Sequence, residues 1–231
     1  MEGTEVRKLA ALEDRHWWYA ERRSLLAAQV AALGTPGTAL DVGAAGGGNT
    51  RVLRDAGWRA LALEYGEEGA QVAHERGLPV VRGDATRLPV ADGSIGLVVA
   101  FDVLEHIDDD DAVVAHVRRA LRPGGTLLVA VPAGMRNWSA HDEAVGHVRR
   151  YEREQLRALL ERGGLEVREL RSWNVLMAPL ARWRRRSATG SDLDDVPAVV
   201  NAGARAVVAL ERVLPVGGLP GISLLATARR P

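Results

Sequence analysis

The stretch from Leu40 to Thr50 constrains this chain more than any other, because it places a glycine-rich turn between a predicted strand and a predicted helix. Residues 38–42 predict a short buried strand, and residues 50–56 carry apolar side chains at helical spacing before a glycine. Glycine has no Cβ, so a ligand can approach the bare backbone of such a turn. Asp41 would repel a pyrophosphate, so the turn favours a ligand with a cationic end. A tight turn without a ligand is the alternative interpretation.

The turn carries most of a known family motif. Asp41-x-Gly43-x-x-x-Gly47 resembles the Asp-x-Gly-x-Gly-x-Gly motif of class I S-adenosylmethionine-dependent methyltransferases. The middle glycine of that motif falls on Ala45, which adds a methyl group where backbone and ligand come close. The resemblance implies S-adenosyl-L-methionine as the cofactor, with Asp41, Gly43, Ala45 and Gly47 at its binding site.

Acidic residues follow the next two predicted strands. Glu64 lies about twenty residues beyond the turn, where a carboxylate can accept hydrogen bonds from both ribose hydroxyls of a nucleoside. This spacing occurs in nicotinamide enzymes as well as in methyltransferases, and a solvated acid at a strand end is the plainer alternative. Tyr65 either stacks on a base or lies on the surface. The family resemblance implies that Asp84 receives the adenine amino group and that the backbone amide of Ala85 meets a ring nitrogen.

The predicted fourth strand, residues 94–101, is apolar on both faces, as expected of a central parallel strand. It runs into Phe101-Asp102-Val103-Leu104-Glu105-His106, which is similar to the family's Asp-x-Leu-Glu-His segment. Ligands of open α/β sheets bind at the carboxyl ends of strands, so Phe101, Asp102 and His106 are predicted at the site. His106 either lies near the methyl group or orients its loop. The aspartates at 108–111 fit a helix N-terminus and not a metal site.

A polar loop at residues 139–151 follows the predicted fifth strand. Substrate chemistry concentrates on such loops, so its histidines are candidate general bases. We rank the candidates as His147, His141 and His106, and a purely structural clamp of the loop is the rival interpretation. An ion held by His141, Asp142 and His147 is a further alternative, but their spacing matches no recognised ligand pattern. We therefore predict no metal site.

Residues 6–33 carry apolar side chains at intervals of three and four and predict one N-terminal helix. Two adjacent tryptophans within it cannot share one helix face, so at least one contacts another element. The arrangement is similar to a subset of the family in which an N-terminal helix covers the site. That likeness implies that Tyr19 and either Arg22 or Arg23 bind the cofactor, the arginine through its carboxylate. Plain packing of the helix over the sheet is the alternative.

The alternation of predicted strands and helices indicates an α/β protein. The resemblance implies a Rossmann-like class I methyltransferase fold, whose seven strands are parallel except for an antiparallel edge pair, with helices on both faces. We divide the chain into an N-terminal helical cap (1–37), an S-adenosylmethionine-binding core (38–172), a helical insert (173–221) and a final strand (222–231). Helices are predicted at 173–186 and 197–214 of the insert. The strands are predicted at 38–42, 59–64, 79–83, 94–101, 126–132, 165–170 and 222–228.

The amino-acid composition limits the classes of partner and the cellular location that we expect for this chain. The 30 basic and 30 acidic residues cancel, so nothing indicates a nucleic-acid partner, and the absence of cysteine excludes disulfides and thiol chemistry. The N-terminus shows no signal-peptide core, and no run approaches the roughly 20 apolar residues of a membrane helix, so we expect a cytoplasmic protein. The apolar residues of the insert are compatible with an apolar substrate pocket, a partner face or a peripheral membrane contact. No feature predicts an oligomeric state.

The predicted function is S-adenosylmethionine-dependent methyl transfer to an oxygen, nitrogen or carbon of a small-molecule acceptor. The leaving thioether is neutral, so such an enzyme mainly aligns nucleophile, methyl group and sulfur. The first alternative is an NAD(P)-dependent oxidoreductase, which shares the glycine turn and Glu64. It fits less well, because the chain lacks a clear Gly-x-Gly-x-x-Gly and carries an acid at position 41. The second alternative is a cofactor-binding module of the same fold that does not transfer a methyl group.

Overall fold

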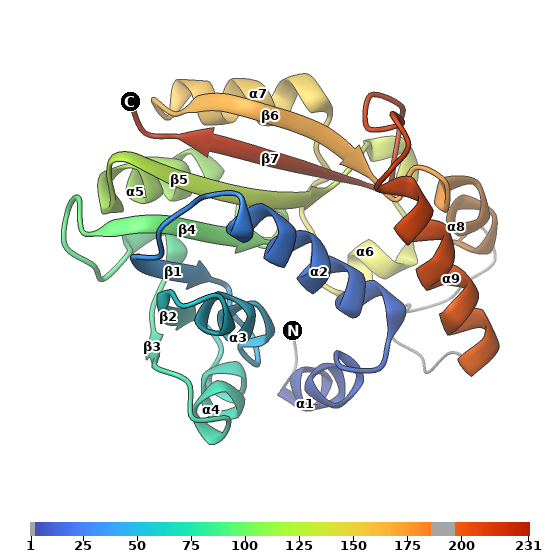
Figure 1. The fold of residues 1–231 in the computed structure, drawn as a ribbon, viewed down its shortest axis with the longest axis horizontal. Coiled ribbons are helices and arrows are strands. Elements are labelled where there is room, and N and C mark those ends of the chain that lie inside the picture. Colours follow the sequence, from blue (N-terminus) through green and yellow to red (C-terminus); the bar gives the residue numbers. More distant parts are fainter. Residues whose placement is uncertain (1–2, 186–196) are drawn as a thin grey trace.

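A seven-stranded sheet forms the centre of the molecule in a computed structural model, which describes residues 3–185 and 197–231 (Figure 1). The strand order is β3-β2-β1-β4-β5-β7-β6, and β7 alone runs against its neighbours β5 and β6. The predicted α/β fold is thereby confirmed. The strands are β1 (Thr38–Val42), β2 (Arg59–Glu64), β3 (Val80–Arg82), β4 (Ile95–Phe101), β5 (Leu121–Pro132), β6 (Glu166–Trp173) and β7 (Ser223–Arg229).

Helices cover both faces of the sheet, because side chains of a buried parallel strand alternate between two apolar surfaces. Val98 of β4 joins the core beneath α5 and α7, whereas Val99 joins the core beneath α2. In Figure 1, α2 crosses the near face of the sheet, and α5 and α7 lie behind it. The α-helices are α1 (Gly3–Leu12), α2 (Trp17–Ala31), α3 (Gly48–Asp55), α4 (Glu67–Glu75), α5 (Asp110–Ala120), α6 (Ala140–Ala144), α7 (Arg153–Arg162), α8 (Ala178–Arg185) and α9 (Ala198–Glu211).

The single N-terminal helix predicted over residues 6–33 is wrong, because the chain breaks into α1 and α2. His16 adopts an extended conformation and its ring accepts a hydrogen bond from the backbone N–H of Trp18, which makes it the N-cap of α2. Before the break, the carboxylate of Glu13 binds Arg51 at 2.8 Å and Arg76 at 2.6 Å. These ion pairs hold the segment after α1 against α3 and the end of α4.

The insert also differs from its predicted helices. Strand β6 continues to Trp173, the next residue Asn174 has a φ of 56°, and α8 begins only at Ala178. Residues 186–196, part of the predicted insert, lie outside the described residues. Helix α9 occupies 198–211 of the predicted 197–214. Within the described chain, no helix combines the length and the apolar character needed to cross a bilayer.

The strand order reverses between β1 and β4. From β1 the chain moves outward to β2 and β3, and it then crosses back to β4 on the other side of β1. At such a switch point the loops after neighbouring strands diverge and leave a crevice at the carboxyl ends. Apart from Tyr19 and Arg22 on α2, the predicted cofactor residues lie at or after the ends of β1, β2, β3 and β4, so this topology brings them to one edge of the sheet.

Candidate active site

The turn between β1 and α3 forms the floor of the crevice. Gly43, Ala45 and Gly47 have positive φ angles of 69°, 47° and 81°. A Cβ on Gly47 would lie 2.1 Å from Leu78 Cδ1, so glycine is required there by packing as well as by conformation. Ala45 adopts the left-handed region without being glycine, which costs about 1–2 kcal/mol. The residue that departs from the family motif therefore keeps the backbone shape of the motif.

Asp41 lies beneath the turn and not in the crevice. Its side chain is fully buried, and Oδ2 accepts a hydrogen bond of 2.6 Å from the hydroxyl of Thr50 in α3. Its other oxygen has no hydrogen-bond partner among the described residues. Burial raises the pKa of Asp41 to about 7, although the bonds from Thr50 act to lower it. The geometry ties the end of β1 to the start of α3 and so positions the turn.

Glu64 closes the turn from the tip of β2. One carboxylate oxygen accepts the backbone N–H of Ala45 at 2.7 Å, and the other accepts that of Gly66 at 2.8 Å. The carboxylate therefore lies at the crevice with acceptor capacity beyond these two bonds. Tyr65 follows with 76% of its surface exposed, at the rim of the same crevice.

Asp84 occupies the tip of β3. Its Oδ1 accepts hydrogen bonds of 2.7 Å from both the backbone N–H and the hydroxyl of Thr86, which makes it the N-cap of the short 3-10 helix Ala85–Arg87. These bonds lower the pKa of Asp84, so the carboxylate is ionised at neutral pH. Its second oxygen does not take part in this cap. Ala85 is buried beside it and lines the crevice.

A buried arginine meets the tip of β4. Arg22 of α2 is 5% exposed, and its NH2 group lies 2.5 Å from Oδ2 of Asp102, which has a φ of 57°. The guanidinium carbon lies 5.3 Å from the ring centre of Phe101 and 5.4 Å from that of Trp173. NH1 has no hydrogen-bond partner among the described residues, whereas NH2 is ion-paired with Asp102. A planar cation held between rings, with donors to spare beside its ion pair, is suited to a carboxylate of a ligand.

Tyr19 and Arg23 complete this end of the crevice. Burial and the nearby charge of Asp102 raise the pKa of Tyr19, so its hydroxyl stays protonated. Arg23 donates a hydrogen bond of 2.5 Å to the carbonyl of Glu13 and another of 3.2 Å to Asp14. Of the two arginines predicted as alternatives, Arg22 has unused donors at the crevice and Arg23 is engaged with the loop between α1 and α2.

The crevice is one cavity of about 1770 Å³. Pockets for a single small ligand usually measure about 300–1,000 Å³, so this cavity has room for a cofactor and a second molecule. Every predicted site residue lines it except Asp41 and Gly47. Its far wall is formed by apolar residues of the insert and by three histidines. The apolar residues are Met177, Leu180, Ala181, Val200 and Ala204.

The three histidines gather where the loop after β4 meets the loop after β5. The ring centres of His106 and His147 are 4.7 Å apart, and those of His141 and His147 are 6.3 Å apart. His147 Nδ1 lies 2.8 Å from Asp142, which also accepts two bonds from Arg150 at 2.7 and 2.8 Å. Burial opposes ionisation of Asp142, but the bonds from His147 and Arg150 hold its pKa well below the usual value.

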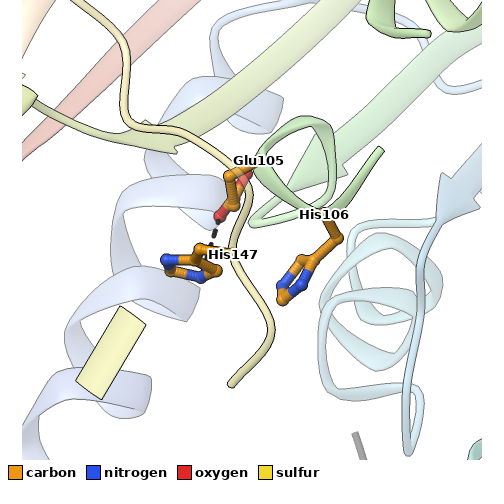
Figure 2. Close-up of side chains that lie close together, drawn as sticks. All are labelled: Glu105, His106 and His147. Atoms are coloured by element: carbon orange, nitrogen blue, oxygen red, sulfur yellow. Dashed lines mark ion pairs between the residues drawn. The ribbon is translucent and has the colours of Figure 1, made fainter. Parts of the chain in front are cut away.

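Glu105 lies behind these rings. It is fully buried, neither carboxylate oxygen has a hydrogen-bond partner in the described chain, and Oε1 is 3.9 Å from Nε2 of His147 (Figure 2). Burial, followed by the charge of Asp102, raises the pKa of Glu105. Burial and the neighbouring His147 lower the pKa of His106.

The sequence analysis did not single out Glu105, Asp142 or Arg150 as members of one polar group. Glu105 belongs to the Asp-x-Leu-Glu-His segment, so the motif itself was a signal that its glutamate has a function. The metal alternative considered for His141, Asp142 and His147 is not supported by geometry, because Asp142 binds Arg150 and Ser139. No sequence spacing pointed to Arg150, which reaches Asp142 across eight residues of an irregular loop.

The comparison with known families shows the family to which the chain belongs. The profile of the family described as "Methyltransferase domain" matches residues 15–170, which is more than half of the chain. The chain belongs to this methyltransferase family. The predicted recognition of a class I S-adenosylmethionine-dependent methyltransferase is confirmed, and S-adenosylmethionine is the cofactor of this class.

Individual relatives of the methyltransferase agree with this assignment. A Mycolicibacterium smegmatis protein named as an S-adenosylmethionine-dependent methyltransferase is 30% identical over 172 residues, which cover 72% of this chain and 66% of the relative. Other curated relatives are covered over a smaller share of their length, for example 48% of a Mycobacterium marinum demethylmenaquinone methyltransferase and 35% of a Xylella fastidiosa malonyl-[acyl-carrier protein] O-methyltransferase. This chain therefore spans at most two thirds of the curated relatives it matches here.

Solved structures share the fold of the methyltransferase. The methyltransferase in a complex with the Haloferax volcanii Trm112 activator has a TM-score of 0.67 at 24% identity, covering 99% of this chain and 95% of that chain. The [4+2]-cyclase SpnF has a TM-score of 0.63 at 22% identity, covering 94% and 83%. At this level of identity both establish the fold alone.

Proposed function

We propose that this chain transfers the methyl group of S-adenosylmethionine to an oxygen, nitrogen or carbon atom of a small-molecule acceptor. The observation that carries the proposal is the buried guanidinium of Arg22 at one end of the cavity, whose NH2 is ion-paired with Asp102 while NH1 has no hydrogen bond among the described residues. Buried donors that stay unused are costly unless a ligand satisfies them. The carboxylate of S-adenosylmethionine supplies that partner, and Tyr19 lies beside it.

Other residues of the cavity fit the remaining parts of the cofactor. We assign Glu64 to the ribose hydroxyls, because its carboxylate lies at the crevice as an acceptor. Asp84 and Ala85 receive the adenine, with Tyr65 at the rim. Asp41 and Gly47 act from beneath the turn by shaping it. The backbone of Gly43 and Ala45, together with Phe101, Asp102 and His106, borders the middle of the cavity.

The acceptor binds at the histidine end of the cavity. The cofactor supplies an electrophilic methyl group, so the protein's own residues must align the nucleophile and remove its proton where it carries one. We assign the removal of this proton to His147 ahead of His141 and His106. Asp142 fixes the ring of His147 through Nδ1, so Nε2 is the atom that accepts the proton. The apolar wall of the insert favours an apolar acceptor such as a natural product over a nucleic acid, in keeping with the zero net charge.

We further propose that the helical cap (1–37) and the insert (173–221) enclose the acceptor over the core (38–172), which the strand at 222–231 completes. Trp18 of the cap and Trp173 at the start of the insert have ring centres 4.7 Å apart. Exposed apolar side chains on α8 and α9, such as Trp183 and Val199, support a peripheral contact with a membrane or an apolar partner. A cytoplasmic location remains part of the proposal.

One experiment separates the proposal from its alternatives. We expect calorimetric titration to give one binding site for S-adenosylmethionine and none for NADH, because the turn lacks the Gly-x-Gly-x-x-Gly pattern of a pyrophosphate site. Binding of NADH alone would instead support the oxidoreductase. Incubation with cell extract and methyl-labelled cofactor should then label a small molecule. The likeness to the cyclase SpnF makes a non-methylating module the second candidate, and tight cofactor binding without any labelled product would favour it.

A further inference from the structure

Glu105, His106 and His147 form a cluster that the proposed function does not explain. One ligand atom from each of the three side chains lies within 4.8 Å of the other two. Figure 2 shows the carboxylate of Glu105 directed at the ring of His147 on the neighbouring loop, with His106 alongside on the same 3-10 turn as Glu105. Methyl transfer needs no carboxyl group here, and a buried carboxyl group whose oxygens have no hydrogen bond is unfavourable in either protonation state. Its position therefore calls for a partner that the described side chains do not supply.

Both imidazoles are oriented so that one nitrogen of each stays available. Asp142 is an acceptor, so Nδ1 of His147 carries the proton and Nε2 carries the lone pair, 3.9 Å from Glu105. Nδ1 of His106 lies 3.2 Å from the carbonyl oxygen of Gly146, which also accepts only. The Nε2 lone pair of His106 is then available in the same way. Histidines that bind metals show this arrangement, in which the other ring nitrogen donates to a carboxylate or a backbone carbonyl.

We propose that Glu105, His106 and His147 bind one divalent transition-metal ion of the Zn²⁺ type. Two imidazoles and one carboxylate are a ligand set of catalytic zinc sites, in which the fourth position stays open. Zinc ligands at about 2.0–2.2 Å lie roughly 3.3–3.5 Å from one another, so the side chains close by about 1 Å around the ion. Mg²⁺ and Ca²⁺ prefer oxygen ligands and fit this set poorly.

The position of the ion indicates which group of the acceptor would bind to it. His106 and His147 line the cavity, so the open coordination position faces the acceptor, at the histidine end of the site. A cation there selects acceptors with an ionisable oxygen, such as a phenol, an enol or a carboxylic acid, because it favours the oxyanion. Coordination uses the same Nε2 lone pair as base catalysis by His147, so this imidazole is a ligand in the metal-loaded protein and a base only without metal.

The test is metal binding, which is measured apart from methyl transfer. The full chain is treated with EDTA, dialysed and titrated with Zn²⁺ by calorimetry. We expect one site per chain, and a loss of affinity of about 100-fold or more in Glu105→Gln and in His106→Ala. His74→Ala, which removes an exposed imidazole on α4, is the matched control and should bind Zn²⁺ as the wild type does. Mg²⁺ at millimolar concentration should not displace the zinc.

Each outcome decides the inference. Zn²⁺ binding of equal affinity in wild type, Glu105→Gln and His106→Ala would overturn it, as would the absence of micromolar binding in the wild type. His106→Ala is a loop variant that keeps the buried core, so it stays informative if Glu105→Gln fails to fold. Titration of the EDTA-treated protein with S-adenosylmethionine separates the two proposals. Cofactor binding without zinc binding removes only the metal site, and zinc binding without methyl transfer removes only the proposed function.

Discussion

At the scale of single residues, the site depends on side chains that are buried at unusual electrostatic cost. Arg22 carries its charge among three aromatic rings and is balanced by Asp102, and Asp41 has its carboxylate beneath the glycine turn. Desolvation penalises both charges, so each must be offset by a specific partner. The partner of Asp41 is the Thr50 hydroxyl, and that of Arg22 is Asp102, which leaves the NH1 donors of Arg22 without a hydrogen bond.

Replacement of Arg22 by methionine should weaken S-adenosylmethionine binding by about 10- to 100-fold, because a charge-assisted bond to the cofactor carboxylate is worth about 1.5–3 kcal/mol. Arg22→Lys should recover part of this loss. Arg23→Met is the matched control and should change the affinity less than about threefold, since Arg23 is bound to the loop at Glu13. Calorimetric titration of the three variants measures these values. Equal affinities for Arg22→Met and wild type would remove Arg22 from the binding site.

The carboxyl group of Asp41 should make stability depend on pH. Its pKa is about 7 in the folded protein and about 3.9 in an unfolded chain, so the folded state holds the proton more tightly. The stability this provides is fully present below about pH 4 and is lost as the pH rises to about 7. The loss is on the order of 4 kcal/mol.

Asp41→Asn should lack this contribution. Urea unfolding of both proteins at pH 5 and pH 8 gives the difference between their free energies of unfolding at each pH, in which the titration of all other groups cancels. We expect the stability of the variant relative to the wild type to increase from pH 5 to pH 8. Parallel pH profiles for wild type and variant would show that Asp41 is ionised normally in the folded state.

At the scale of elements, the cap helix α2 is held by the sheet on one side and by α9 on the other. Leu26 and Val30 of α2 belong to the core that covers β4 and β5. The side chain of Asn201 in α9 accepts the backbone N–H of Trp17 at 2.7 Å and donates to the carbonyl of Arg15 at 2.9 Å. A residue 184 positions away in the sequence therefore secures the start of α2, where backbone N–H groups have no partner within the helix.

Asn201→Ala should lower the free energy of unfolding by about 1–2 kcal/mol through the loss of these two bonds. For a chain of this length the melting temperature should fall by about 2–8 °C. Asn201→Asp keeps the acceptor for Trp17 and loses only the donor to Arg15, so its melting temperature should lie between those of Asn201→Ala and the wild type. Thermal melting followed by circular dichroism gives the comparison. A melting temperature of Asn201→Ala equal to that of the wild type would show that α9 does not secure α2.

At the scale of the whole molecule, the site exists because four strand tips and two helical segments meet around one cavity. The carboxyl ends of β1 to β4 supply the turn, Glu64, Asp84 and Asp102. Arg22 comes from α2, which crosses the near face of the sheet in Figure 1. Residues of α2 and of the four strand tips line the cavity of about 1770 Å³. A ligand that bridges these elements should stabilise the entire fold and not one loop.

S-Adenosylmethionine should therefore raise the melting temperature. At a concentration 100 times its dissociation constant the expected stabilisation is about 2.7 kcal/mol. This corresponds to about 5–10 °C for a chain of this length. NADH at the same concentration should cause no shift. Differential scanning calorimetry with Arg22→Met as the control tests this, and a shift of the same size in that variant would show that the cofactor binds elsewhere.

Local patterns in the sequence determined the strands, their order of alternation with helices and the acidic residues at their ends. The predicted strand over residues 38–42 agrees with β1, and the predicted acid Glu64 is the last residue of β2. Such features depend on side-chain periodicity and turn chemistry within about ten residues, so they can be inferred without knowledge of the packing. The family motif added the association of those strand ends with one cofactor.

Only the tertiary structure decided which side chains meet. It separated Arg22 from Arg23, because one residue of rotation on a helix turns a side chain by about 100°; both line the cavity, but Arg23 is bonded to the loop at Glu13 and Asp14, whereas NH1 of Arg22 has no hydrogen bond among the described residues. It showed that the N-terminal helix ends before His16, whose ring caps α2, while Glu13 pairs with arginines at α3 and at the end of α4. It also brought Glu105 within 3.9 Å of His147 across 42 positions of sequence. Contacts of this kind depend on how separate elements dock, and no periodicity within one element encodes them.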